Sequence, residues 1–235
     1  MIKKITTVLL LCFFSVNFVN AAGMIDDPLL TKIMIDQLEV RSSDGETETV
    51  WEADIWIGKD LNKLWIKTEG EFSDGETEEA ELQLLYSRGI ARYWDFQVGY
   101  RHDFRPKPTR DWMAIGFQGL APYFFEVDTA LFVGQDGQTA LRLQGEYEIL
   151  FTQRLILTPE AEVNFYGKSD AALGVGSGLS DLSLGLRLRY EIKREFAPYI
   201  GIYWKQQYGE TADFAQAIGA KTDDTQFVIG IRAWF

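Results

Sequence analysis

The stretch LSLGLRLRYEI, residues 182–192, alternates apolar and polar side chains over eleven positions. Alternate residues of a β-strand face opposite sides, whereas a helix would spread both sets around its surface. Residues 141–149 alternate in the same way, with Leu, Tyr and Ile between Arg, Gln and Glu. Both segments are therefore predicted to be strands with one apolar and one polar face.

The same pattern extends along most of the chain. The candidate strands are 33–41, 48–58, 62–73, 78–88, 92–104, 110–120, 123–134, 138–151, 154–168, 180–192, 197–209 and 224–235. Strands of soluble proteins usually run about 5 or 6 residues, whereas tilted membrane-spanning strands need about 9 to 11. The lengths favour an all-β fold, a single antiparallel up-and-down transmembrane β-barrel of about 12 strands.

The connections between these strands alternate in length. Several odd-numbered links, such as 169–179 and 210–223, are long and polar, whereas even-numbered links such as 59–61 are short. Outer-membrane barrels have short periplasmic turns and longer outside loops, so an even strand count predicts that both termini are periplasmic. Aromatic residues near strand ends are expected to form the interfacial girdles: Trp51, Trp65, Tyr93, Trp94, Tyr123, Tyr199 and Trp234.

The N-terminal residues resemble an export signal. Lys3 and Lys4 precede an apolar run from Val8 to Val19, and cleavage is expected after Ala21. This divides the chain into a signal peptide (1–21), a short periplasmic segment (22–32) and an outer-membrane barrel (33–235). The expected location is the bacterial outer membrane.

Charge and cysteine content exclude several functions. Removal of the leader takes away Lys3 and Lys4 and leaves 21 basic against 35 acidic residues, a net charge of −14 that repels nucleic acid. Cys12, the only cysteine, leaves with it. The mature chain therefore has no disulfide, no thiolate metal site and no cysteine nucleophile.

The polar face of the strands carries many charges. The acidic residues predicted to face the lumen are Glu52, Asp54, Glu69, Glu71, Glu81, Glu126, Asp128, Glu146, Glu148, Glu160 and Glu162. Basic residues such as Arg142 and Arg187 share this face, and buried charges must be paired, hydrated or engaged with a cation. A paired, watery plug and a cation path are both consistent with this. On the pattern alone, Arg187→Leu should destabilise the barrel less than Leu186→Arg.

His102, the sole histidine, lies near the outer end of a predicted strand. A hairpin symmetric about Lys107 and Pro108 would place His102 opposite Met113 and Asp103 opposite Trp112. Imidazole and thioether suit copper, particularly Cu(I), so His102, Met113 and Asp103 are candidate ligands, although the same pair is consistent with an interfacial histidine beside a lipid-facing methionine.

A hydrolase is a less favoured alternative. His102 and Asp103 form the only histidine constellation, and no serine is close in sequence, because Ser177, Ser180 and Ser183 belong to a distant hairpin. The chain is therefore not expected to be an enzyme.

Long motifs resemble the bacterial copper resistance protein B family of outer-membrane proteins. They include the segments 51–58, 63–71, 77–88, 100–104, 110–112, 118–123, 176–181 and 194–199, and the resemblance runs from residue 35 to residue 235. It implies a role in copper homeostasis or resistance, with copper, as Cu(I) or Cu(II), as the bound or transported ion. The implied partners are membrane lipid, copper ions and periplasmic copper-handling proteins.

One feature departs from the family. Members commonly carry a Met/His-rich segment before the barrel, whereas residues 22–34 contain only Met24 and Met34 as soft candidate ligands. The copper hypothesis therefore depends more on His102, Met113 and the acidic lumen. A general small-solute channel, or a plugged structural barrel without metal preference, is the alternative function.

Overall fold

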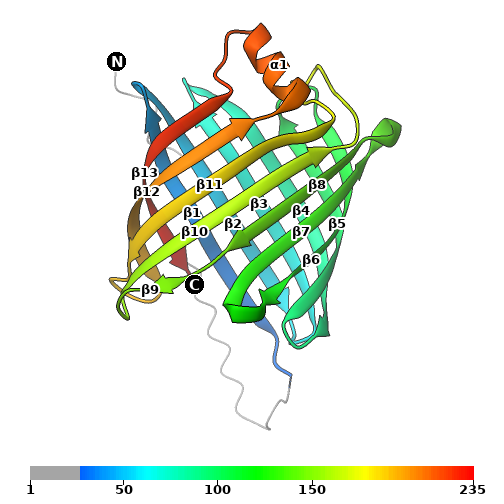
Figure 1. Cartoon of the computed structure of the whole chain (residues 1–235). Helices are drawn as coiled ribbons and strands as arrows, with labels where there is room; N and C mark the ends of the chain where they lie inside the picture. Colours follow the sequence, from blue (N-terminus) through cyan, green and yellow to red (C-terminus); the bar gives the residue numbers. More distant parts are fainter. Residues whose placement is uncertain (1–26) are drawn as a thin grey trace, which may run out of the picture.

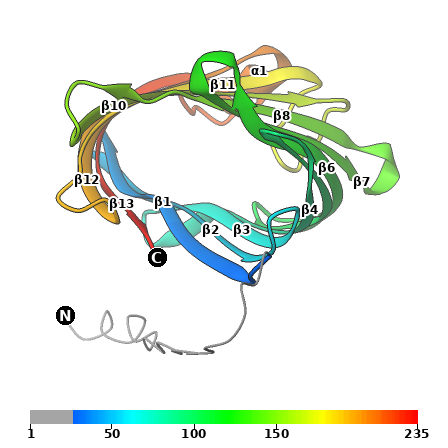
Figure 2. The same ribbon diagram turned by 90° about the horizontal axis from the view of Figure 1, so that it is seen from below.

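The computed structural model describes residues 27–235, in which the strands form one continuous ring (Figures 1 and 2). The leader and Met24 lie outside the described residues. The elements are β1 (Leu30–Ser43), β2 (Glu46–Gly58), β3 (Asn62–Ser73), β4 (Glu76–Ala91), β5 (Trp94–Arg105), β6 (Arg110–Ala121), η1 (Pro122–Phe124), β7 (Phe125–Gly134), η2 (Gln135–Gly137), β8 (Thr139–Glu146), β9 (Ile149–Leu150), β10 (Leu155–Tyr166), β11 (Gly178–Tyr190), β12 (Phe196–Gln207), α1 (Gly209–Ala217) and β13 (Asp223–Trp234).

The fold is a closed antiparallel barrel of 12 strands, which confirms the predicted fold class. Each strand pairs with its neighbours in the sequence, except that β8 and the short β9 both pair with β10 and so count as one strand of the ring; β1 pairs with β13 to close it. Ile33 and Phe235 exchange backbone hydrogen bonds at this seam, with N···O distances of 3.0 and 2.9 Å. β1 begins at Leu30, so the first strand includes three residues that were expected in the 22–32 segment.

The strand predicted over 138–151 is interrupted. β8 and β9 both pair with β10, and residues 147 and 148 between them are not part of a strand. The break lies beside Pro159 of β10, whose carbonyl accepts a hydrogen bond from the Tyr147 amide. Proline has no backbone N–H to return, and the ladder stops at this point.

The long loops gather at one end of the barrel, and the start of β1 and the end of β13 lie at the opposite end (Figure 1). One of them, the long polar link expected over 210–223, contains nearly all of the helix α1. By the turn asymmetry of outer-membrane barrels, we assign the α1 end to the outside. The end that holds the start of β1 and the end of β13 is assigned to the periplasm.

No helix in residues 27–235 is long and apolar enough to cross a membrane.

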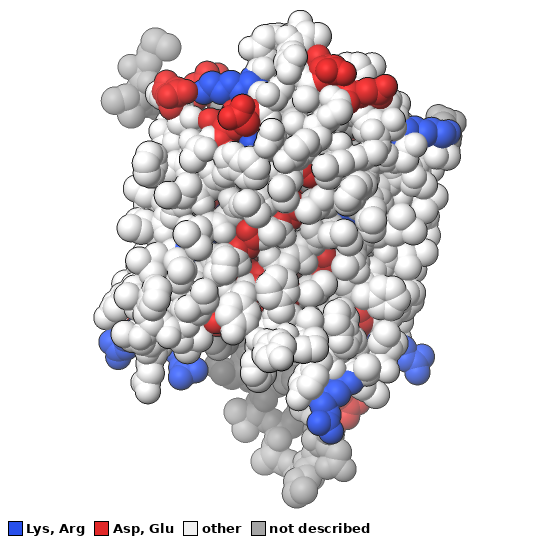
Figure 3. Space-filling view, viewed as in Figure 1, with Lys and Arg blue, Asp and Glu red and all other residues white. Residues whose placement is uncertain are grey.

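The strand pattern separates an apolar outer face from a charged inner face. Leu184 and Leu186 are each 44% exposed on the outside, whereas Arg187 and Arg189 are each 6% exposed and point inward. On the face in view, Figure 3 shows a largely uncharged band in which a few acidic atoms are visible, with acidic residues prominent at the α1 end and mostly basic residues at the opposite rim. This band is the surface that faces lipid.

We expect Leu186→Arg or Leu143→Arg to destabilise the barrel by about 2–4 kcal/mol, because each places a charge against the lipid core near the middle of a strand. Urea titration in liposomes measures this loss, with Leu186→Ile as a control that preserves the apolar surface. If Leu186→Arg and the control unfold at the same urea concentration, that face does not contact lipid.

Candidate functional site: the charged lumen

The lumen contains a dense network of charged side chains, which divides into a structural cluster at the barrel seam and a network that spans the middle. At the seam, Glu39 of β1 is fully buried and bonds to Arg187 of β11, with an Nε–Oε2 distance of 2.8 Å. Arg41 lies 2.7 Å from the same carboxylate, and the Tyr199 hydroxyl donates to it at 2.8 Å. Arg187 also contacts Glu160 of β10 at 2.5 Å. The cluster therefore ties the first strand to the last third of the barrel.

This cluster changes two expectations. Tyr199 lies inside the barrel at 5% exposure, so its prediction as an interfacial girdle residue was wrong. Arg187 is the main partner of a buried carboxylate. Arg187→Leu should therefore be costly, contrary to what the alternation alone suggests.

We expect Arg187→Leu to lower the free energy of unfolding by about 3–5 kcal/mol, because it leaves Glu39 buried with fewer partners. Adding Glu39→Gln should recover part of this loss. Arg194→Leu, at an exposed turn position, is the control. Equal urea midpoints for Arg187→Leu and Arg194→Leu would show that the seam cluster does not hold the barrel together.

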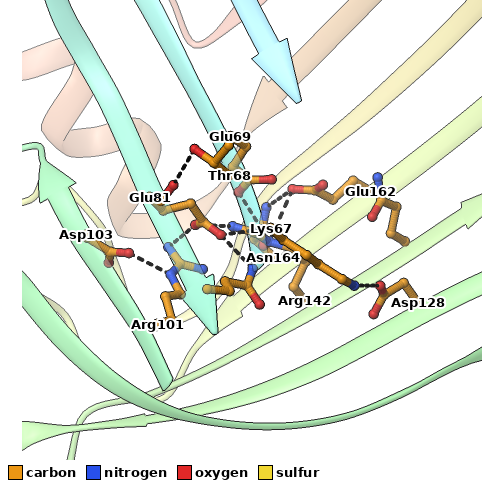
Figure 4. A network of polar contacts seen from close by, with 12 residues as sticks. Lys67, Thr68, Glu69, Glu81, Arg101, Asp103, Asp128, Arg142, Glu162 and Asn164 are labelled. Atoms are coloured by element: carbon orange, nitrogen blue, oxygen red, sulfur yellow. Dashed lines mark hydrogen bonds and ion pairs between the residues drawn. The ribbon is translucent and has the colours of Figure 1, made fainter. Parts of the chain in front are cut away.

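The second network spans the middle of the lumen (Figure 4). Arg142 of β8 contacts Glu69 of β3 at 2.5 Å and Glu81 of β4 at 3.1 Å. Its Nε lies 3.8 Å from Glu162 of β10. Glu81 is also held by Arg101 at 2.6 Å. The network thus connects opposite walls of the barrel.

Arg101 is positioned by a short chain of contacts. Its Nε bonds to Asp103 at 2.6 Å, and the Trp112 indole N–H donates to the other oxygen of Asp103 at 2.7 Å. Closer to the periplasmic end of the lumen, Lys67 and Asp128 form a separate ion pair at 2.7 Å. These contacts fix several inward charges in place.

Two cavities occupy the lumen, one on each side of this network. The periplasmic cavity has a volume of about 360 Å³ and is lined by Asp54, Glu126, Asp128 and Glu146 among others. The outer cavity has a volume of about 270 Å³, and its walls include Glu71, Glu160 and Glu162. Both cavities reach the same central layer. The residues that line both are Glu52, Glu69, Glu81, Arg142 and Gln144.

The acidic residues predicted to face the lumen lie inside the barrel. Ten of the eleven line one or both cavities. The remaining one, Glu148, bonds to Arg189 at 2.5 Å and to Arg232 at 3.4 Å. In the described chain, Glu52, Glu126 and Glu146 have no Lys, Arg or His nitrogen within 4.0 Å. The lumen thus contains carboxylates without a counter-ion in contact.

The loop over 167–177 and the helix α1 contribute wall residues to the outer cavity, among them Gly174 and Thr211. Gly176 donates its backbone N–H to the Thr211 hydroxyl at 2.8 Å, and Ser169 bonds to Glu210. Asp170 of this loop accepts hydrogen bonds from Arg110 and Gln138. Burial tends to raise the pKa of Asp170, but these bonds lower it below its usual value. The loop is therefore anchored to the barrel wall by an ionised carboxylate.

The predicted copper ligands near the outer rim are not brought together as expected. His102 pairs with Asp111, and Met113 pairs with Tyr100, so the predicted opposition of His102 and Met113 was wrong. The expected pairing of Asp103 with Trp112 was also wrong, because Asp103 pairs with Arg110, although its side chain does bond to the Trp112 indole.

His102 lies on the lipid side of the barrel. Its Nδ1 is 2.5 Å from Asp111 Oδ1, its ring packs edge-on against Phe104, and Tyr100 also bonds to Asp111. Asp103 points inward, because neighbouring residues of a strand face opposite sides. His102 and Met113 are diagonal neighbours on the outer face. Their role as copper ligands stays a prediction.

The remaining candidates are also separated. Met34 is inside the barrel at 8% exposure and pairs with Asp54. Ser180 and Ser183 are buried on the inner face of β11, whereas His102 is on the outer face of β5. In residues 27–235, no group of three or more His, Cys, Asp and Glu side chains is arranged to hold a metal ion.

The closed barrel, its apolar outer band and its charged interior define an outer-membrane β-barrel protein. Solved structures with this fold include the NanC porin, at a TM-score of 0.56 and 12% identity, covering 87% of this chain and 99% of the porin. The KdgM porin has a TM-score of 0.54 and 10% identity with the same coverage. These similarities concern the fold.

Sequence comparison is more specific. The model of the family described as "Copper resistance protein B precursor" matches residues 29–235. Copper resistance protein B of Escherichia coli is 52% identical over 203 residues, covering 86% of this chain and 69% of that protein. The homolog from Pseudomonas syringae pv. tomato is 42% identical over 210 residues, covering 89% and 71%.

The chain belongs to the copper resistance protein B family. It is an outer-membrane protein with a role in copper resistance, and its relatives are named as copper resistance proteins rather than as enzymes.

Proposed function

We propose that the barrel acts in copper resistance by passing copper through its lumen as a hydrated divalent cation. The observation that carries this proposal is the set of carboxylates that line the two cavities. Three of them, Glu52, Glu126 and Glu146, contact no basic side chain in the described residues. Glu52 lines both cavities and therefore lies at the layer that every passing ion must cross.

The physical basis is the cost of an uncompensated charge. A carboxylate partly removed from bulk water is unfavourable unless a counter-ion or ordered water compensates it. A mobile cation supplies that compensation, and acidic walls raise the local concentration of cations in a narrow lumen. The lumen would therefore admit cations in preference to anions.

The donor chemistry favours Cu(II) over Cu(I) for this path. Cu(I) prefers soft thioether and thiolate ligands, whereas a hydrated divalent ion interacts readily with oxygen donors. The inner face of the described barrel offers many carboxylates, and its thioether is that of Met34. Such a lumen suits the transient passage of a hydrated Cu²⁺ ion. Periplasmic copper-handling proteins are the proposed partners at the periplasmic mouth.

A plugged structural barrel is the second candidate. It is favoured by the ion pairs of Arg142, which connect opposite walls between the two cavities. Small barrels commonly fill their interiors with side chains. A general cation channel without preference for copper is the third possibility, and the same experiment separates all three.

We expect Glu52→Gln to slow entry of Cu²⁺ into proteoliposomes by about threefold or more, because removing one charge beside the path weakens its attraction for a cation by on the order of 1 kcal/mol. A copper-sensitive dye trapped inside reports the initial rate. The matched control is Glu195→Gln, in the exposed periplasmic turn between β11 and β12.

Each other outcome has a defined meaning. Entry no faster than in protein-free liposomes would contradict the proposal and support the plugged barrel. Equal entry of Mg²⁺ and Cu²⁺ would support a general cation channel. Equal rates for Glu52→Gln and the wild-type chain would show that this carboxylate does not line the path.

A further inference from the structure

The central layer of the lumen contains one side chain that crosses from wall to wall. Arg142 extends from β8, and its guanidinium ends between Glu69 and Glu81, on strands β3 and β4. Figure 2 shows β3 and β8 on opposite sides of the lumen. Because Arg142 lines both cavities, it stands where they meet.

The two carboxylates that hold Arg142 are not equally dependent on it. Glu81 also bonds to Arg101 at 2.6 Å and to Gln83 at 2.7 Å. Glu69 has Arg142 as its ion-pair partner among the described residues. Glu81 would therefore stay in place without Arg142, whereas Glu69 would lose its counter-ion.

The hydrogen-bond donors of Arg142 are only partly satisfied. Its Nη1 and Nη2 atoms bond to carboxylates, but its buried Nε has no hydrogen-bond partner and lies 3.8 Å from Glu162. The guanidinium also lies over the Phe132 ring, 5.7 Å from its centroid. It is thus held mainly through its tip, by carboxylates for which a passing cation would compete.

We propose that Arg142 is the gate of the lumen, a tethered positive charge that limits the flux of cations and must leave Glu69 for an ion to cross. This inference rests on the proposed passage of cations through the barrel. Four carboxylates, Glu52, Glu69, Glu81 and Glu162, surround the layer, against the guanidinium groups of Arg142 and Arg101. Removing Arg142 both widens the layer and makes it more acidic.

The test is the conductance of the purified full-length barrel in planar bilayers bathed in a KCl gradient. Arg142→Gln should raise the unitary conductance by about threefold or more and move the reversal potential toward that of K⁺, because ring charges at a constriction set selectivity. Arg142→Lys keeps the charge but cannot contact Glu69 and Glu81 at once as a guanidinium does, so it should give an intermediate conductance.

The matched control is Arg189→Gln. Arg189 also points inward and is ion-paired, to Glu148, but it lines neither cavity, so its removal should leave the conductance unchanged. The heat-modifiable band on a gel verifies that each variant is folded. If Arg142→Gln does not fold, the charge-balanced double variant Arg142→Gln/Glu69→Gln takes its place, with the same expected rise in conductance.

A folded Arg142→Gln or double variant with wild-type conductance and reversal potential would overturn the gate. Equal increases in Arg142→Gln and Arg189→Gln would overturn it as well, because the effect would then not be specific to the central layer. The K⁺ readout is independent of copper. A gate confirmed with K⁺ in a barrel that does not admit Cu²⁺ would refute the proposed function and leave the gate standing.

Discussion

The structure depends on one constraint, which is that lipid offers no hydrogen-bond partner to a backbone N–H or C=O group. A sheet in the membrane must therefore close on itself, and here β1 and β13 provide the closing pair. Once the ring is closed, each strand has one face toward lipid and one toward the lumen. The apolar residues occupy the first face, and nearly all charges of the strands are confined to the second.

The charges confined to the interior fall into two groups. At the seam, Glu39, Arg187 and Tyr199 are buried together and connect strands that are far apart in sequence. In the middle, Arg142 joins opposite walls and Arg101 holds one of its partners, Glu81, but other carboxylates are left without a basic partner in contact. The same set of inward positions thus supplies the ion pairs that join the strands and the carboxylates on which the proposed cation path rests.

Periodicity was sufficient to predict the barrel and the facing of its residues. A period of two assigns each residue to one side of the sheet, which is why the inward position of Glu52 or Arg142 could be read from the sequence. Pairing register could not be read in this way. The hairpin between β5 and β6 turns one residue earlier than a turn centred on Lys107 and Pro108, which shifts each partner by two residues. Such a shift preserves the face, so His102 remains on the outer side but meets Asp111.

Other differences have local physical causes. The helix α1 is only 9 residues long, and its buried Thr211 and Ala215 give too short a pattern to distinguish it from a loop. Tyr199 was predicted at the interface because aromatic residues favour strand ends, but its hydroxyl is bound to a buried carboxylate on another strand. Long-range ion pairs such as Arg142 with Glu69 depend on the curvature of the closed ring, which local sequence does not encode.

The central claim is that copper is accommodated by the carboxylates of the lumen. Anomalous diffraction at the copper edge, from crystals of the barrel soaked in a Cu²⁺ salt, tests this most directly. If copper passes through the lumen, copper peaks are expected inside the ring, beside the carboxylates of the two cavities and at the layer of Glu52 and Glu69. Peaks confined to the outer surface, or an interior without copper in crystals that bind it elsewhere, would contradict it.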